Sequence, residues 1–231
     1  MVRPQFINGE IYHLYNRGVE KRNIVQNDKD RLRIIHDLFS FNDVAPTLNN
    51  GYRHETKTAT NKPRKLLVEI FCFCIMPNHY HLLVRQLVEN GITLFMRKFG
   101  TGYTNYFNKK YDRVGPLFQG KFKAVLVKKE QHVLYLPHYI HLNPLDLSTP
   151  EWRSGSIQNI KLALDFLESY RWSSYADYIG KNNFPSLTQR DSLLNLYKDR
   201  ANSIVEYRNE FLDWLKDISL DSIEGVLLEN Y

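Results

Sequence analysis

The fold is decided by the stretch VEIFCFCIMPNHYHLLV, residues 68–84. Two apolar runs flank a Met-Pro-Asn break, a pattern typical of two strands joined by a tight turn. Successive side chains on a strand alternate between faces, so His79 and His81 project from the same face of the second strand. Two imidazoles placed in this way can bind one cation. Tyr80 and Leu82 are expected on the opposite face.

A second stretch, PHYIHLNP at residues 137–144, can supply the remaining groups of such a site. Two histidines alone do not complete a metal site. On a helix, Tyr139 and Asn143 are four residues apart and therefore share a face. They would present a phenol and a carboxamide oxygen to whatever the histidine pair holds. His138 and His141 would face elsewhere.

These two motifs resemble a known family. His-Tyr-His matches the His-hydrophobe-His signature of the HUH nucleases, and Tyr-Ile-His-Leu-Asn-Pro resembles the tyrosine helix of their single-tyrosine transposases, in particular the REP-associated tyrosine transposases. The resemblance spans residues 9–178 and includes, in this order, YHLYNRG at 12–18, MPNHYHLL at 76–83, residues 99–106, GPLFQG at 115–120 and YRWSSY at 170–175.

The resemblance implies a fold and an activity. The fold is an α+β, ferredoxin-like antiparallel sheet with helices packed on it, the HUH palm, followed by a helical C-terminal extension. The activity is that of a single-stranded DNA endonuclease and strand transferase, a transposase that acts near hairpins such as REP-like palindromes. Tyr139 is then the nucleophile, and its attack leaves a 5′-phosphotyrosine and a free 3′-hydroxyl. A phenol with a pKa of about 10 needs a base or a nearby cation for this.

A divalent ion can neutralise the phosphate oxygens during such a reaction. We expect His79, His81 and Asn143 to hold it, the two histidines being the positions at which the family places its metal ligands. The mixed nitrogen and oxygen donors suit Mn²⁺, Mg²⁺ could serve in the cell, and imidazoles also accept Zn²⁺.

The basic residues are unevenly distributed. The chain of 231 residues has a formal charge of +6, which suits a polyanionic partner. Residues 97–130 carry nine Lys or Arg against two acids, whereas residues 201–231 carry two against seven. We expect the DNA-binding residues to be Asn16, Arg17, Arg97, Lys98, Tyr103, Arg113, Gln119, Lys121 and Lys123, because many of these cations alternate with aromatic side chains that can stack unpaired bases.

The remaining patterns predict the other elements. Strands are expected at residues 10–17 and 119–128, and helices at residues 28–39, 92–106, 131–143 and 161–170, with two or three more after residue 188. Gly100 and Gly102 weaken the second helix and fit either the approach of a nucleic-acid backbone or close packing of the helix against the sheet. Residues 43–64 are expected to form a polar loop or an insertion, and helices are expected on one side of the sheet.

Pro137 lies inside the expected tyrosine helix, where proline removes a hydrogen bond. Either the helix kinks there or a new helix starts with Pro137 at its first position. Both alternatives keep Tyr139 and Asn143 in register, and Pro144 should end the helix.

We expect a catalytic domain at residues 1–150 and a mostly helical extension at 151–231. The N-terminus lacks a signal-peptide pattern and no apolar run is long enough to span a bilayer, so we expect a cytoplasmic protein with no membrane partner. Cys72 and Cys74 should be buried thiols. Both a monomer and a homodimer fit the sequence. The active site could be built within one chain or between two chains.

Two other functions fit the sequence. One is a non-catalytic protein derived from a transposase that binds nucleic-acid hairpins. The other is a replication initiator or relaxase with the same chemistry, for which Tyr135 would be a second tyrosine. Pro137 between Tyr135 and Tyr139 argues against a shared helical face.

Overall fold

A four-stranded antiparallel sheet carries the histidine pair. The computed structural model describes residues 4–46, 64–155, 157–196, 203–216 and 218. Its strands are β1 (Ile11–Arg17), β2 (Val68–Ile75), β3 (His79–Gln86) and β4 (Lys123–Leu126), in the spatial order β2-β3-β1-β4. The predicted hairpin and first strand are confirmed. β4 is shorter than predicted because a turn with Gly120 at φ 83° precedes it, so Lys121 lies outside the strand.

Two helices cover one face of this sheet. α1 (Asp28–Ser40) begins at a capping box in which Asn27 and Asp30 bind each other's backbone N–H groups, and α2 (Gly91–Lys110) follows the central hairpin. The order β1-α1-β2-β3-α2-β4 is that of ferredoxin-like folds. The core on this side includes Leu82 and Tyr80 from β3. The predicted α+β, ferredoxin-like architecture is confirmed.

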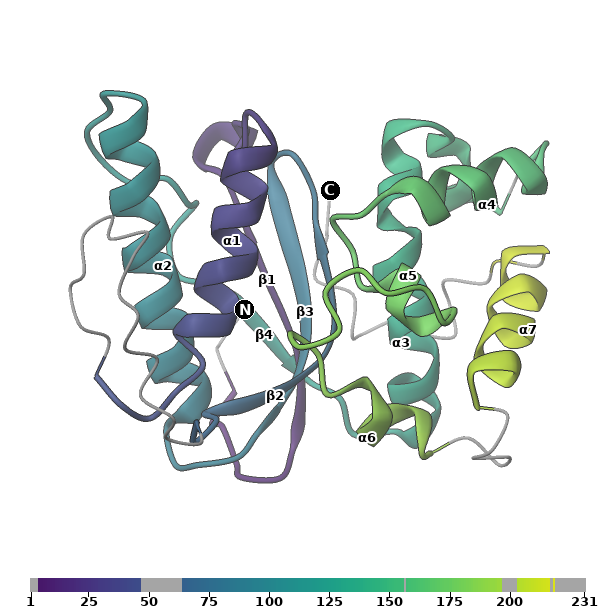
Figure 1. Cartoon of the computed structure of the whole chain (residues 1–231), viewed down its shortest axis with the longest axis horizontal. Helices are drawn as coiled ribbons and strands as arrows, with labels where there is room; N and C mark the ends of the chain where they lie inside the picture. Colours follow the sequence, from purple (N-terminus) through teal and green to yellow (C-terminus); the bar gives the residue numbers. More distant parts are fainter. Residues whose placement is uncertain (1–3, 47–63, 156, 197–202, 217, 219–231) are drawn as a thin grey trace.

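Helices also cover the other face, which corrects the expectation of helices on one side only. Figure 1 shows α1 and α2 on one side of the sheet and the later helices on the other. A second buried core joins them to the sheet through Leu83 and the thiols Cys72 and Cys74. Cover on both faces accounts for the burial of β1, β2 and β3, in which neighbouring residues that point to opposite faces are buried alike. The later elements are α3 (Glu130–Leu142), η2 (Asn143–Leu147), η3 (Pro150–Ser154), α4 (Ile160–Ser169), α5 (Tyr175–Tyr178), α6 (Arg190–Leu194) and α7 (Ser203–Lys216).

α3 is one helix with Pro137 inside it. The alternative in which a new helix starts at Pro137 is therefore wrong. The helix ends at Leu142, directly before Asn143 and Pro144, as predicted. The predicted register of Tyr139 and Asn143 is confirmed, since the Asn143 side chain donates to the Tyr139 carbonyl at 2.8 Å.

The outer edge of β2 is paired with a segment from far along the chain. Ile75 N–H donates to the Trp172 carbonyl at 2.9 Å, and Ser174 N–H donates to the Phe73 carbonyl at 3.0 Å. The Tyr178 hydroxyl adds a bond to the Phe71 carbonyl at 2.9 Å. These bonds cover an edge that would otherwise be open to pairing with another chain.

Parts of two predictions lie outside the described residues, namely residues 47–63 of the predicted polar loop and the segment after residue 218. The boundary at residue 150 stays a prediction. The second core takes side chains from both sides of it, for example Tyr139 and Phe211. In the part of the chain that is described, no helix has both the length and the apolar character needed to cross a bilayer.

Candidate active site

His79 and His81 lie on the face of β3 that packs against α3. Their ring centroids are 5.2 Å apart with the ring planes at 89°, which confirms that the two side chains share a face. Antiparallel pairing places Arg17 opposite His79 and Tyr15 opposite His81 on β1. His81 is fully buried and His79 is 8% exposed, so His79 lies at the outer end of the pair.

Each histidine has a partner for its Nδ1 atom. His79 Nδ1 lies 2.6 Å from Asn78 Oδ1, and the orientation of this amide is set by Asn78 Nδ2, which donates to the Lys21 carbonyl. An amide oxygen can only accept, so His79 is the donor. The proton on His79 is thereby assigned to Nδ1. His81 Nδ1 lies 2.9 Å from His13 Nε2 on β1. With His81 as the donor, Nε2 would be the atom of each ring left to bind a metal, the arrangement that metal-ligating histidines adopt.

The sequence reasoning missed His13. A signal existed: positions 13, 15 and 17 alternate along β1, so they share one face. The sequence does not indicate that β1 pairs with β3, nor the register that places this face beside His81. The His13 and His81 rings are stacked, with centroids 5.1 Å apart.

Tyr139 reaches the histidines from α3. Its ring meets that of His81 edge-on, with centroids 5.9 Å apart and an angle of 87°, and lies 6.4 Å from the His13 ring. Tyr139 is fully buried. The structure therefore brings the predicted nucleophile to the predicted metal-binding pair, in a closed environment.

Asn143 follows directly after α3, as the first residue of η2. Its Oδ1 accepts a hydrogen bond from Arg153 Nη2 at 3.2 Å. The carboxamide thus lies beside the tyrosine as predicted. Its oxygen, the atom expected to bind metal, contacts a guanidinium in this conformation.

Arg153 and Asp146 are further site residues that the sequence reasoning did not identify. Arg153 binds both carboxylate oxygens of Asp146, with Nε to Oδ1 at 2.8 Å and Nη2 to Oδ2 at 2.7 Å. Its Nη1 also lies 3.4 Å from the Tyr139 hydroxyl. The guanidinium packs over the Trp152 ring at 4.7 Å, and Trp152 Nε1 donates to Asp146 Oδ1. No periodicity links these residues to Tyr139, so only the path of η2 and η3 brings them there.

His138 and His141 of α3 point away from Tyr139, as predicted. His138 packs among Tyr207, Phe211 and Trp214 of α7, and its burial lowers its pKa to about 3. His141 bonds Ser174 and Tyr207, and burial holds its pKa well below the usual range.

The donor atoms available suit a divalent ion only in part. Among the described residues, no group of three or more His, Cys, Asp or Glu side chains could hold a metal. The predicted set differs from such a group, because it consists of two imidazoles and one amide oxygen. The two histidines could bind a divalent ion through their Nε2 atoms. Asn143 could bind it through Oδ1 only if Arg153 releases or shares this oxygen.

Five of the nine predicted DNA-binding residues lie on β1, at the start of β4 or on the segment that leads into β4. Arg17 lies at the end of β1 and its Nη2 donates to Gln119 Oε1 at 3.3 Å. Lys123 extends over the Tyr15 ring at 5.8 Å, on the histidine face. Asn16 lies on the other face, where its side chain binds the Gly120 carbonyl. Lys121 is exposed on the segment leading into β4.

The other four predicted DNA-binding residues lie on or just after α2, in the opposite layer. Tyr103 is fully buried and its hydroxyl donates to the Ile24 carbonyl at 2.6 Å, so its ring is not placed to stack on a base. Lys98 binds the carbonyls of Asp43 and Ala45. Arg97 is exposed, and Arg113 binds Asn108 after the helix. The structure does not bring these four residues to the histidines.

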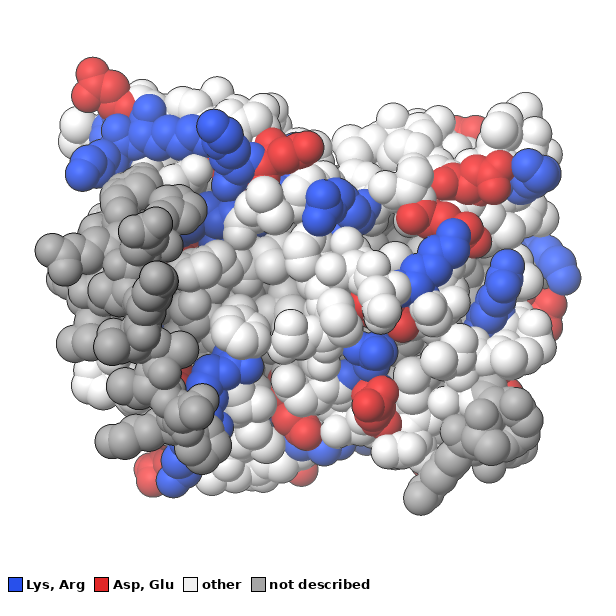
Figure 2. All heavy atoms as spheres, in the orientation of Figure 1, with Lys and Arg blue, Asp and Glu red and all other residues white. Residues whose placement is uncertain are grey.

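Surface charge alone does not delimit a binding face in the view of Figure 2. Basic and acidic side chains are interspersed over the described part of that face. The groups near the histidines are therefore a better guide to a binding site than the net charge.

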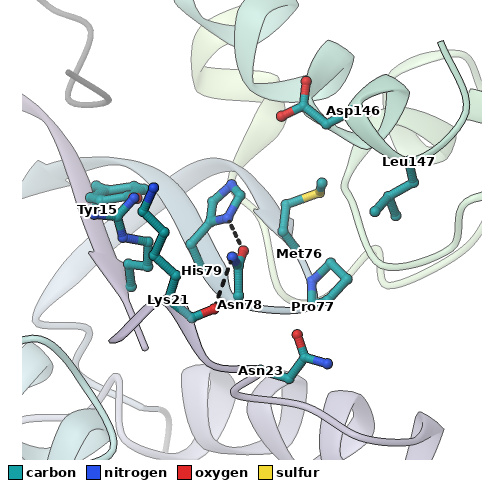
Figure 3. A pocket seen from close by; sticks show the side chains of 10 residues that line it. Tyr15, Lys21, Asn23, Met76, Pro77, Asn78, His79, Asp146 and Leu147 are labelled. Atoms are coloured by element: carbon teal, nitrogen blue, oxygen red, sulfur yellow. Dashed lines mark hydrogen bonds between the residues drawn. The ribbon is translucent and has the colours of Figure 1, made fainter. Parts of the chain in front are cut away.

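A cavity of about 370 Å³ opens beside His79. Figure 3 shows Tyr15 and Lys21 on one side of it and Asp146 and Leu147 on the other, with His79 and Met76 between them. The site thus combines a buried tyrosine, two oriented imidazoles and an adjoining open space.

Comparison with known proteins decides the family. A family model described as "Transposase IS200 like" matches residues 12–143, which include both histidines, Tyr139 and Asn143. The chain belongs to the IS200-like transposase family. Membership agrees with the resemblance expected from the motifs, and the match ends where η2 begins.

A solved structure supports the fold of this IS200-like transposase. It is described as a REP-associated tyrosine transposase bound to a REP hairpin, and it matches with a TM-score of 0.51 at 12% sequence identity. The match covers 80% of this chain and 88% of the other. No curated protein sequence matches the chain.

Proposed function

We propose that this IS200-like transposase is a metal-dependent, single-stranded DNA endonuclease and strand transferase that cleaves near hairpins through Tyr139. One observation carries the proposal: the Tyr139 ring lies against His81, within a family match that covers both. The hairpin substrate is proposed from the similar structure, whose DNA is a REP hairpin.

The reaction exchanges one phosphodiester for another. The Tyr139 oxygen forms a bond to phosphorus while the bond from phosphorus to the 3′ oxygen breaks, leaving a 5′-phosphotyrosine and a 3′-hydroxyl. The phenolic proton is lost as the new bond forms and the departing 3′ oxygen gains one. Because the bond energy is kept, attack by another 3′-hydroxyl rejoins strands and frees the tyrosine.

His79 Nε2, His81 Nε2 and Asn143 Oδ1 would hold a divalent ion, Mg²⁺ or Mn²⁺. Such an ion supplies Lewis-acid polarisation of the phosphate oxygens. The chain's own part is orientation: Asn78 and His13 fix the two imidazoles, and α3 fixes Tyr139 against His81.

The proposal includes a local rearrangement. Tyr139 is fully buried, and Arg153 contacts both its hydroxyl and Asn143 Oδ1. Arg153 has to release both groups when substrate and metal bind. Its guanidinium can then neutralise the entering phosphate.

The test is a covalent-adduct assay. The protein is incubated with labelled single-stranded hairpin DNA and Mn²⁺, denatured, and separated by electrophoresis, in parallel with Tyr139→Phe. We expect a protein–DNA band for the wild type only, with DNA binding nearly equal in both, because the substitution removes only the nucleophilic oxygen. Cleavage by Tyr139→Phe at the wild-type rate would refute the assignment.

The burial of Tyr139 favours one alternative, a hairpin-binding protein without catalysis. That function predicts binding of hairpin DNA by both proteins and an adduct from neither, across a hairpin library with either metal. The same assay therefore separates the two functions.

A further inference from the structure

The cavity beside His79 carries charges suited to a phosphate. Arg17 and Lys21 line it, and Lys21 is exposed. Asp146 also lines it, but both of its carboxylate oxygens are bound by Arg153 and one also by Trp152. Since the carboxylate is compensated within the protein, the two cations dominate what an entering ligand meets.

The wall that carries Lys21 is tied to the histidine pair. Lys21 ends a 3₁₀ turn, η1 (Val19–Lys21), in which Glu20 and Lys21 have φ of 55° and 58°. Left-handed backbone at two successive non-glycine residues is costly and persists where the surroundings hold it. Asn78 does so, donating through Nδ2 to the Lys21 carbonyl at 3.3 Å and binding His79 Nδ1 through Oδ1 (Figure 3).

The size and lining of the cavity suit one nucleotide. Its volume of about 370 Å³ lies in the range of small-ligand sites, about 300–1,000 Å³. Exposed Asn23 offers an amide donor and acceptor to a base edge, and Leu147, which is 49% exposed, offers an apolar surface. Cations at one end and amide and apolar groups at the other match a phosphate joined to a base.

We infer that this cavity binds one unpaired nucleotide flanking the cleaved phosphodiester, with Lys21 and Arg17 on its phosphate and Asn23 at its base. The inference rests on the proposed function. Asn78 joins the two sites, because it holds the Lys21 wall and the His79 imidazole at once. A nucleotide seated in the cavity therefore sets which phosphodiester of the strand lies at His79.

The experiment measures how unpaired DNA adds to hairpin affinity. A fluorescent DNA hairpin without unpaired ends, and the same hairpin with thymidine extensions of increasing length on either side, are titrated by anisotropy. Tyr139→Phe is used throughout to prevent cleavage. The compared proteins carry Lys21→Met or, as a matched control, Lys161→Met, whose 84% exposed side chain lies on α4 away from the cavity.

We expect an extension that reaches the cavity to tighten binding by Tyr139→Phe and by the Lys161→Met control. Lys21→Met should lose this gain but keep its affinity for the unextended hairpin. The slope of log affinity against log salt concentration for the extended hairpin should be lower by about 0.7 in this variant, the value for one phosphate contact in a single strand. Lys21→Arg should restore the gain. Equal gains in Lys21→Met and Lys161→Met, or no gain from any extension, would overturn the inference.

Failure of the inference and failure of the proposed function are distinguishable. A wild-type covalent adduct together with equal gains in the two lysine variants leaves the nuclease proposal standing and removes the nucleotide site. A gain that depends on Lys21 without any adduct leaves the site standing and removes the nuclease proposal.

Discussion

The Arg153 guanidinium lies 3.2 Å from the Asn143 carboxamide oxygen, the atom expected to complete the metal site. The same side chain contacts the Tyr139 hydroxyl and is anchored on Asp146. The Arg153 guanidinium therefore lies next to the proposed nucleophile, Tyr139. In the proposed metal site, a divalent ion and Arg153 would therefore compete for the Asn143 oxygen.

This competition predicts that Arg153→Ala strengthens Mn²⁺ binding. The expected increase is about fivefold, the effect of losing one competing hydrogen bond of ~1 kcal/mol. Mn²⁺ titration followed by electron paramagnetic resonance measures it without DNA. Arg190→Ala is the control, because Arg190 binds only the Pro185 carbonyl in the described structure. Weaker Mn²⁺ binding by Arg153→Ala would show that Arg153 supports the site instead.

His13 is expected to act through His81. His13→Leu removes the partner of His81 Nδ1 and should lower Mn²⁺ affinity by about ten- to a hundredfold, the usual effect of losing such a partner. His13→Gln keeps a polar group there and should recover part of the loss. His36→Ala, on the exposed side of α1, is the control. An unchanged Mn²⁺ affinity in a folded His13→Leu protein would exclude this role.

Burial of His138 predicts a pH-dependent stability. Its pKa is lowered to about 3, below the value of about 6.5 expected in the unfolded chain. The unfolded state therefore binds the proton first as the pH falls from 6.5 towards 3, and stability is lost across that window. Neither ring nitrogen has a hydrogen-bond partner within the described residues.

His138→Leu should accordingly remove this part of the pH dependence, up to ~1.4 kcal/mol per pH unit. Urea unfolding of wild type and variant at pH 7 and pH 5 measures the difference, and the variant should gain relative stability at pH 5. A parallel decline of both proteins would mean that His138 does not carry the effect.

The two glycines of α2 form a matched pair. A Cβ on Gly102 would lie 2.5 Å from the Phe41 ring, whereas a Cβ on Gly100 meets nothing within 4 Å. Gly102→Ala should therefore destabilise by about 1–3 kcal/mol through overpacking. Gly100→Ala should stabilise by about 1 kcal/mol through helix propensity. Thermal unfolding checks both, and equal effects would contradict the packing explanation.

The pair also shows what could be predicted about α2. Close packing, one of the two interpretations of its glycines, is found at Gly102, but the partner is Phe41 at the end of α1 and not the sheet that the interpretation named. For Tyr103, the prediction from the sequence was wrong. Its place in an aromatic stripe fitted base stacking, yet the stripe faces the sheet, so the ring is buried in the core.

Some features of the candidate site could likewise be predicted from the sequence, and others could not. The residue pattern alone places His79 and His81 on one face and Tyr139 and Asn143 one helical turn apart, because strand alternation and helical periodicity are local properties of the backbone. Local geometry also placed His138 and His141 away from the tyrosine.

Packing between distant segments sets which side chains surround these groups. His13 reaches His81 through the register of β1 on β3, and Arg153 reaches Asn143 and Tyr139 through the turns of η2 and η3. This packing also places helices on both faces of the sheet. Such contacts depend on packing between segments far apart in the chain, and no short-range pattern of residues encodes that packing.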